Sequence, residues 1–381
     1  MRINGLSLFA NIGVAEAYLD KVGVDIKVAN EILKDRARFY ADIYKKTAMV
    51  VGDITDETIY KKVINLSKDN NVKFVIATPP CQGMSTAGTQ REDDERNYLI
   101  KYGVRAILDL NPEYAIIENV PQVLRTYIPT EFGVLLIPDY ILKSLSNQYN
   151  IVYKTISCLD YGVPQMRNRC IFLLSRKDMK YAWNFPTAKS KTITLRDAIG
   201  DLPSLDPKIQ GFSHEQILKV FPEYDSKKAE GLKVSKWHYP PTHKYRHVEV
   251  MMHTPEGQSA LNNQTFYPKT KSGQKVKGFS NTYKRQFWDK PAYTITTYNG
   301  AVCSQDNVHP GRFIKEENGE CFYSDARVFS IYELLILMSL PKDWDIPSWA
   351  NESLIRHAIG EGIPPLVIKK IVKELEDNYE Q

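Results

Sequence analysis

A lone cysteine in the segment Thr78–Gly88, "TPPCQGMSTAG", is the first candidate for chemistry. Cys81 follows an apolar run and two prolines, which fix the backbone and remove two N–H donors. Small residues such as Gly83 and Gly88 come after it. A nucleophile held rigidly beside a flexible loop is suited to covalent catalysis. The alternative is an inert buried thiol, because free cysteines are commonly buried.

An acidic side chain and two basic side chains later in the chain provide further candidates. Glu118 ends the apolar run "YAIIEN", where burial would raise its pKa and let it donate a proton near neutral pH. Gln165, Arg167 and Arg169 are spaced by two, so they share one face of an extended segment. Two neighbouring guanidinium groups require an anion or polar acceptors. The alternatives are a helix cap for Glu118 and surface salt bridges for the arginines.

The elements that position these residues alternate between strands and helices over the first 185 residues. Such alternation is typical of an α/β fold with a parallel sheet, which places ligands beyond the carboxyl ends of its strands. Cys81 and Glu118 each follow a predicted strand. We expect strands at 5–10, 25–30, 74–78, 114–119 and 169–175, with helices at 14–23 and 31–44.

The loop after the first predicted strand, with the acidic residues that follow it, favours a nucleoside ligand. The turn around Gly13 can direct backbone N–H groups at a ligand, and Glu31, about 20 residues on, can accept hydrogen bonds from ribose hydroxyls. Asp53, near the next strand, can read an adenine amino group. The chain lacks a lysine-bearing phosphate loop, which disfavours a nucleoside triphosphate.

The α/β pattern ends near Pro186, and the next segment is basic. Residues 186–300 contain 18 Lys and Arg against 10 Asp and Glu, although the net charge of the whole chain is only +5. We predict one domain at 1–185, completed by 350–381, and a second, irregular domain at 186–349. The basic balance of the second domain indicates a polyanionic partner.

Composition excludes several classes of protein. No run approaches the roughly 18 apolar residues of a membrane span, and no signal peptide is evident, so we expect a cytoplasmic protein. The five cysteines are widely spaced, which argues against a disulfide framework or a cysteine zinc site. His243, His247 and His253 cluster, but nearby prolines suit a loop rather than a zinc-binding helix, so we expect no metal.

Taken in order, the motifs resemble those of the cytosine-5 DNA methyltransferase family over nearly the whole chain. The similar segments are "LSLFANIG", "PPCQGMS", "ENV", "QMRNR", "WDKPAYTITT", "HPGR", "ARVFSIYELLILMSLPKDW" and "AIGEGIPPLV". The resemblance implies a Rossmann-like, S-adenosylmethionine-dependent methyltransferase domain with a mostly parallel sheet, plus a smaller irregular target-recognition domain. It implies that the target cytosine flips out of the duplex and that the loop 81–96 closes over it.

The resemblance also implies a role for each site residue. Cys81 attacks C6 of cytosine, and Glu118 donates a proton to N3. Arg167 stabilises charge at O2 and orients Glu118. Arg169 supports Cys81 and the base. The implied cofactor contacts are Phe9 on the adenine, Glu31 on the ribose, Asp53 and Ile54 at the adenine edge, Leu99 in the same pocket, and Asn11, Gly13, Pro79 and Glu361.

Three residues depart from the family pattern. Asn11 and Val14 stand where the family has glycines, and Glu361 stands where it usually has asparagine. An acidic side chain at position 361 would repel the carboxylate of the cofactor unless it binds the α-ammonium group.

The predicted function is site-specific DNA cytosine-5 methylation by a monomer acting on double-stranded DNA, in a restriction–modification system with a cognate restriction endonuclease. An RNA (tRNA) cytosine-5 methyltransferase is the near alternative. A non-catalytic DNA-binding relative and a nicotinamide-dependent oxidoreductase are more distant ones. The intact set of Cys81, Glu118 and Arg167 disfavours the former, and the absence of a G-x-G-x-x-G loop disfavours the latter.

Overall fold

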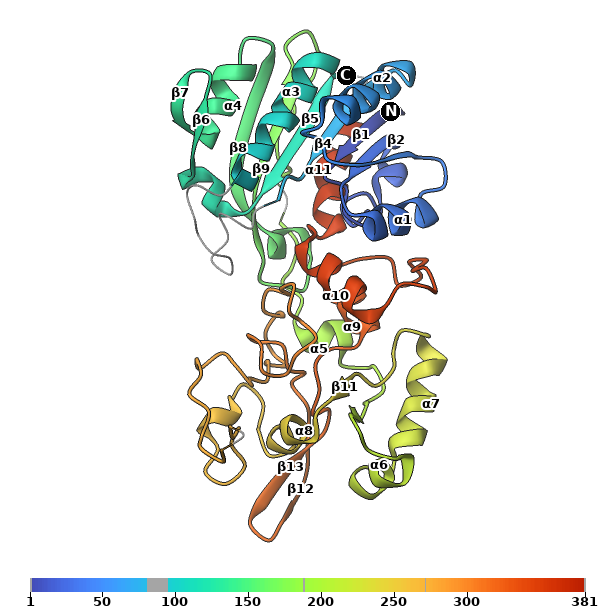
Figure 1. The fold of residues 1–381 in the computed structure, drawn as a ribbon, viewed down its shortest axis with the longest axis vertical. Coiled ribbons are helices and arrows are strands. Elements are labelled where there is room, and N and C mark those ends of the chain that lie inside the picture. The colour runs from blue at the N-terminus through green and yellow to red at the C-terminus, as the bar shows by residue number, and fades with distance from the viewer. Residues whose placement is uncertain (1, 81–94, 188, 271, 380–381) are drawn as a thin grey trace.

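The protein consists of a large sheet-containing body and a smaller, less regular body below it (Figure 1). The computed structural model describes residues 2–80, 95–187, 189–270 and 272–379. Cys81 and most of the loop that follows it therefore lie outside the described residues. No helix among the described residues is long and apolar enough to cross a membrane.

A seven-stranded sheet forms the centre of the upper body, with the strand order β3-β2-β1-β4-β5-β9-β8. The first five strands of this order are parallel, and β9 and β8 are antiparallel to their neighbours. The predicted α/β fold with a mostly parallel sheet is confirmed. The strands are β1 Ile3–Leu8, β2 Val24–Glu31, β3 Ala48–Val51, β4 Val72–Ala77, β5 Tyr114–Asn119, β8 Tyr149–Ser157 and β9 Asn168–Arg176.

Helices cover both faces of this sheet because its central strands are apolar on both sides, as buried parallel strands require. One core lies against α2, α3 and α4, and the other lies against α11, the last helix of the chain. The C-terminal helix thus packs against the upper body. The helices are α1 Lys34–Ile43, α2 Glu57–Asp69, α3 Ile100–Leu110, α4 Ile137–Leu145 and α11 Pro365–Asn378. A small hairpin, β6 Tyr127–Thr130 with β7 Gly133–Leu136, precedes α4.

The helix predicted at 14–23 is wrong. Turns occupy most of this segment, and only Leu19–Val22 forms a short 3₁₀ helix. Val14 packs in the cluster around α9 (Ile331–Leu337), whereas Ala15 and Leu19 pack in the cluster around α11. Neighbouring side chains are thus buried on opposite sides, which favours turns over a regular helix with one apolar face.

The lower body has its own apolar core and more helix than the sequence suggested. Its helices are α5 Leu195–Ile199, α6 His214–Val220, α7 Tyr224–Val234 and α8 Tyr245–Met252, and its short strands are β10 Lys208–Ile209, β11 Thr242–His243, β12 Phe313–Glu317 and β13 Glu320–Tyr323. Helices α9 and α10 (Glu352–Glu361) lie between the two bodies. A shared cluster there joins Ile12 and Phe39 of the upper body to Trp288 and α9, so the domain limits 186–349 remain a prediction.

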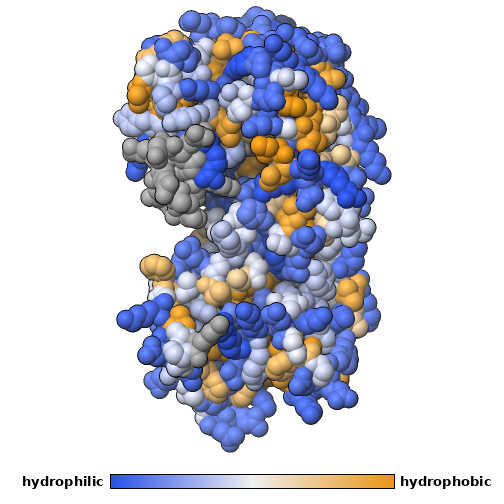
Figure 2. All heavy atoms as spheres, in the orientation of Figure 1, coloured by the Kyte–Doolittle hydropathy of each residue, from blue (hydrophilic) through white to orange (hydrophobic). Residues whose placement is uncertain are grey.

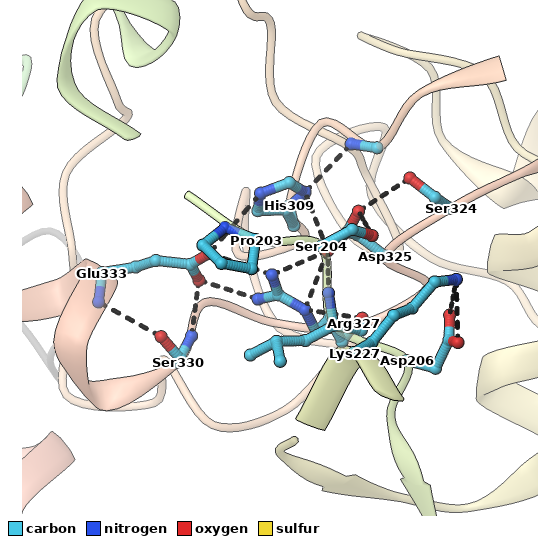
Figure 3. Close-up of polar contacts among 12 residues, drawn as sticks. Pro203, Ser204, Asp206, Lys227, His309, Ser324, Asp325, Arg327, Ser330 and Glu333 are labelled. Carbon is cyan, nitrogen blue, oxygen red and sulfur yellow. Dashed lines mark hydrogen bonds and ion pairs between the residues drawn. The ribbon is translucent and has the colours of Figure 1, made fainter. Parts of the chain in front are cut away.

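A buried ionic network anchors the start of α9 (Figure 3). Arg327 lies 2.7 Å from Asp325 and 2.7 Å from Glu333, and all three side chains are buried. Glu333 also accepts a hydrogen bond from the backbone N–H of Ser330, which closes a capping box. The network satisfies its own charges, as buried ions require.

Candidate active site at the carboxyl edge of the sheet

The predicted acid and an arginine meet on adjacent strands. Strands β5 and β9 pair in antiparallel register, and Arg169 Nε lies 2.9 Å from Oε1 of Glu118. Both side chains are buried. Burial raises the pKa of Glu118, and the positive charges of Arg169 and Arg167 partly oppose that rise. The arrangement provides a carboxyl group that can hold a proton beside a fixed cation.

Arg167 makes contacts that its expected role did not include. We expected it to orient Glu118, but Arg169 makes that contact. The Arg167 guanidinium instead donates to backbone carbonyl oxygens of Ile295 at 2.8 Å, Gly360 at 2.9 Å and Gly362 at 2.8 Å. These acceptors lie in two distant segments of the chain, so Arg167 ties the site to α10. Sequence spacing placed both arginines on one face but could not say which acceptor each would meet.

The two prolines at the end of β4 are fixed by a neighbouring side chain. Asn119 Nδ2 donates to the carbonyl oxygen of Pro79 at 3.1 Å, and its Oδ1 accepts from the backbone N–H of Val120 at 2.8 Å. Thr78 Oγ1 donates to the carbonyl oxygen of Phe9 at 3.2 Å. The backbone leading to Cys81 is thus anchored to β1 and β5. No role was predicted for Asn119, although its place beside Glu118 in "ENV" was a usable signal.

Glu31 lies at the carboxyl end of β2 and faces the first loop. Its two oxygens accept hydrogen bonds from the backbone N–H groups of Asn11 and Leu33, each at 2.9 Å. Burial raises the pKa of Glu31, and those hydrogen bonds and the charge of Arg36 oppose the rise. A carboxylate held in this way retains acceptor capacity for ligand hydroxyls.

The first loop uses left-handed backbone conformations. Phe9 has φ 60°, Asn11 has φ 50° and Gly13 has φ 84°. Asparagine tolerates this region better than most residues, which explains how Asn11 can stand where glycine was expected. Val14 packs directly against Gly362, where an added Cβ would lie 2.8 Å from the Cβ of Val14. Both departures therefore fit the local packing.

The remaining predicted cofactor residues lie around the same edge. Phe9 and Leu99 are half-buried against the core under α3, and Ile54 is buried in it. Asp53 is exposed, and its Oδ1 accepts from the N–H of Thr55 at 2.9 Å. Three apolar side chains near Glu31 are exposed: Ile32, Leu33 and Val51. Figure 2 shows hydrophobic residues gathered on the upper half of the visible face.

These features fit an adenosine-containing cofactor. Apolar side chains and an acidic acceptor next to each other suit a base and a ribose. In addition, Oδ1 of Asn11 is buried and accepts no hydrogen bond from any described residue. An unpaired buried acceptor is costly, and a ligand donor at this loop would satisfy it.

Among the described residues, Arg36 and His357 contact the carboxylate of Glu361. Its Oε2 lies 2.6 Å from Arg36 Nη1, and its Oε1 lies 3.0 Å from His357 Nε2. The i, i+4 spacing of His357 and Glu361 was a local signal, but the contact with Arg36 joins residues 325 positions apart. Only the fold brings them together.

The histidine cluster of the lower body has structural contacts. His243 Nε2 accepts from the N–H of Val328 at 3.2 Å, and His253 stacks on Phe266 with ring centroids 3.7 Å apart. His247 lies on α8 rather than in the expected loop. No group of three or more metal-ligating side chains is found within the described ranges.

Aromatic and basic side chains of the lower body divide into two sets. Trp288 and Tyr283 are buried in apolar clusters. Lys269 and Lys275 lie over the ring of Tyr267, at 5.2 and 4.9 Å. The light-orange segment that contains them lies on the left of the lower body in Figure 1, the side on which Figure 2 shows a hollow between the two bodies.

Comparison with known proteins gives a consistent result. Residues 3–377 match the family model described as C-5 cytosine-specific DNA methylase. The chain is 43% identical to the Type II methyltransferase M1.HgaI of Avibacterium volantium over 378 residues, with 98% of each chain covered. It is 30% identical to the Type II methyltransferase M.XorII of Xanthomonas oryzae over 207 residues, which cover 53% of this chain.

Solved structures agree on the fold. A prophage-encoded protein from E. coli, described as a DNA modification methyltransferase, superposes with a TM-score of 0.67 at 20% identity, and the match covers 100% of both chains. The Dnmt2 methyltransferase of S. pombe superposes with a TM-score of 0.59 at 16% identity and 99% coverage of both.

Proposed function

This chain belongs to the C-5 cytosine-specific DNA methylase family, and within it we propose that Cys81, Glu118 and Arg169 carry the reaction. The chain is a DNA (cytosine-5)-methyltransferase with Type II relatives. The observation that most supports the residue assignment is the buried contact of 2.9 Å between Arg169 and Glu118, on the strand next to the Pro79 turn. Arg167, whose contacts hold α10 in place, is proposed to stabilise the charge that develops at O2.

The proposed chemistry starts with the thiolate of Cys81, which forms a bond to C6 of the flipped cytosine. The displaced electron pair moves to N3, and Glu118 donates a proton there, which leaves C5 with enamine character. When bound, S-adenosylmethionine would supply the electrophilic methyl group for C5 and would leave as S-adenosylhomocysteine. The proton on C5 is then lost to water, Glu118 recovers the N3 proton, and the S–C6 bond breaks to return the thiolate.

Arg169 makes this sequence possible by fixing Glu118. A buried carboxyl group with a fixed orientation keeps its proton until the cytosine binds, because burial disfavours the charged form. The Arg169 cation prevents the pKa from rising so far that the proton cannot be transferred. Asn119 keeps the Pro79 turn, and with it the approach to Cys81, at a constant distance from Glu118.

S-adenosylmethionine is the proposed cofactor, held at the carboxyl ends of β1, β2 and β3. Glu31 accepts from the ribose hydroxyls, Phe9 and Leu99 contact the adenine together with Ile54, and Asp53 reads its edge. Asn11, Gly13, Pro79 and Glu361 complete the pocket. The support is the carboxylate of Glu31 beside exposed apolar residues and the unpaired Oδ1 of Asn11.

Double-stranded DNA is proposed to lie in the hollow between the two bodies, where the basic lower body neutralises phosphates. We further propose a cytoplasmic monomer whose methylation protects sites from a cognate restriction endonuclease, without a stable complex between the two. Sedimentation of the purified chain and a digestion assay on methylated plasmid test these two points.

Labelled methyl transfer to duplex DNA and to tRNA tests the function. We expect transfer to duplex DNA only, whereas transfer only to tRNA would overturn the proposal. Duplexes with 5-fluorocytosine at the site, first located by bisulfite sequencing, should trap the wild-type chain covalently, because fluorine cannot leave C5 as the proton does. Cys81→Ser should form no such adduct while it still binds DNA.

A further inference from the structure

An ion pair joins α1 to α10 beside the first loop. Arg36 Nη1 and Glu361 Oε2 are 2.6 Å apart, and their side chains are 12% and 20% exposed, so a ligand can reach both. His357 Nε2 lies 3.0 Å from the other oxygen of Glu361. The pair is therefore formed and oriented without any ligand.

The position of this pair links it to the proposed cofactor pocket. Asn11 Nδ2 donates to the carbonyl oxygen of Ala358 at 3.0 Å, one turn before Glu361 on α10. The charges of Arg36 and Glu361 both act on Glu31, the first lowering its pKa and the second raising it. The pair thus lies close to both the Asn11 loop and the carboxylate proposed for the ribose.

The charges at this place need an explanation. Two carboxylates, Glu31 and Glu361, would attract an ammonium group but would repel a ligand carboxylate. Arg36 supplies the compensating charge. Its planar guanidinium presents five N–H donors, and the contact with Glu361 uses Nη1, which leaves a fork suited to a second carboxylate.

We propose that Arg36 and Glu361 together recognise the zwitterionic amino-acid end of S-adenosylmethionine. Glu361 accepts from the α-ammonium group, and Arg36 donates to the α-carboxylate. His357 is a positioning residue that holds Oε1 of Glu361. This inference rests on the proposed use of S-adenosylmethionine, and it removes the charge conflict that the acidic residue at position 361 would otherwise create.

Titration calorimetry with two ligands tests the proposal on the full chain. S-adenosylhomocysteine carries the zwitterionic end, and 5′-methylthioadenosine lacks it. We expect Arg36→Ala to raise the Kd of S-adenosylhomocysteine roughly tenfold or more, the scale of a lost charge-assisted hydrogen bond, and to change the Kd of methylthioadenosine less than twofold. Arg36→Lys should restore part of the loss, and Glu361→Gln should reproduce it.

The matched control is Arg105→Ala, which breaks a similar contact of 2.8 Å between α3 and α2 on the outside of the sheet. It should leave both Kd values unchanged. Equal losses for the two ligands in Arg36→Ala and in the nearly isosteric Glu361→Gln would show a structural role and overturn the inference. Failure of the wild-type chain to bind either ligand would instead overturn the cofactor proposal, and this inference with it.

Discussion

Arg169 and Glu118 face each other from adjacent strands that run in opposite directions, with Nε and Oε1 2.9 Å apart. The contact depends on β9 joining an otherwise parallel sheet in antiparallel register. This pairing places the Arg169 guanidinium at the carboxyl end of β5, where Glu118 lies. The strand reversal is therefore part of the active site as well as of the fold.

Glu118→Gln should slow methyl transfer by about 10²- to 10⁴-fold, because the amide cannot donate and recover the N3 proton. Single-turnover transfer to duplex DNA measures the change, and the Kd of S-adenosylhomocysteine should stay constant. The wild-type rate should fall as pH rises through the raised pKa of Glu118, and the variant should lack this decline. Glu113→Gln, just before the other end of β5, is the matched control. An unchanged rate in Glu118→Gln would remove the proposed acid.

Asn119→Ala should lower the transfer rate with little effect on cofactor affinity. The substitution removes the buried hydrogen bond to the carbonyl oxygen of Pro79 and leaves that oxygen unpaired, at a cost of about 1–3 kcal/mol in unfolding free energy. Urea unfolding and single-turnover kinetics measure the two effects. If the rate per folded molecule equals that of the wild type, the turn does not position the nucleophile.

Glu16→Gln should stabilise the protein at alkaline pH. Glu16 is buried behind the first loop, where it accepts a hydrogen bond from Ser7, and burial raises its pKa to about 7. Its native form binds a proton more tightly than the unfolded chain does, so stability is greatest below the unfolded pKa near 4.5 and falls as pH rises through about 7. The free energy of unfolding of Glu16→Gln relative to the wild type should be about 3 kcal/mol higher at pH 8 than at pH 4.

Urea unfolding of both proteins at several pH values between 4 and 8 measures this gain. A matched control is Glu57→Gln on the surface of α2, which should not reproduce the alkaline gain. A difference between wild type and Glu16→Gln that does not vary with pH would show that Glu16 titrates at its ordinary value in the folded state.

Arg327→Met should destabilise the lower body strongly. The substitution leaves the buried carboxylates of Asp325 and Glu333 without their cation, for which about 3–5 kcal/mol is expected. These contacts hold the pKa of both carboxyl groups below the usual range, so the wild type should lose this stability as pH falls through those low values. Thermal unfolding measures the loss, and Arg105→Ala, an exposed pair, should cost less than about 1 kcal/mol. A small loss in Arg327→Met would mean that water reaches the network.

Replacing Lys269 and Lys275 with Gln should weaken DNA binding equally on cognate and unrelated duplexes. If each lysine neutralises one phosphate, the slope of log K against log salt should decrease by about 2. Fluorescence anisotropy across a salt series measures the slope. Lys61→Gln with Lys62→Gln on α2 is the control, and an equal change in both variants would place the DNA elsewhere.

The sequence by itself determined which residues follow the strands and therefore which edge of the sheet carries them. Strand–helix alternation and the prolines before Cys81 are local patterns, and they predicted the α/β fold and the places of Glu31 and Glu118. The helix at 14–23 failed although its composition was helical. Its neighbouring side chains are buried by elements from opposite sides, and local propensity carries no information about that.

Only the tertiary structure decided which of these residues meet. Arg167 and Arg169 are two residues apart and were expected on the same face of the strand. The antiparallel pairing of β9 brings Arg169 to Glu118, whereas Arg167 donates to a backbone carbonyl oxygen of α10. Arg36 and Glu361 are 325 residues apart in the sequence, and Trp288 of the basic segment is buried by packing around α9. Contacts between distant segments depend on strand register and helix docking, which are set by the packing of the whole chain.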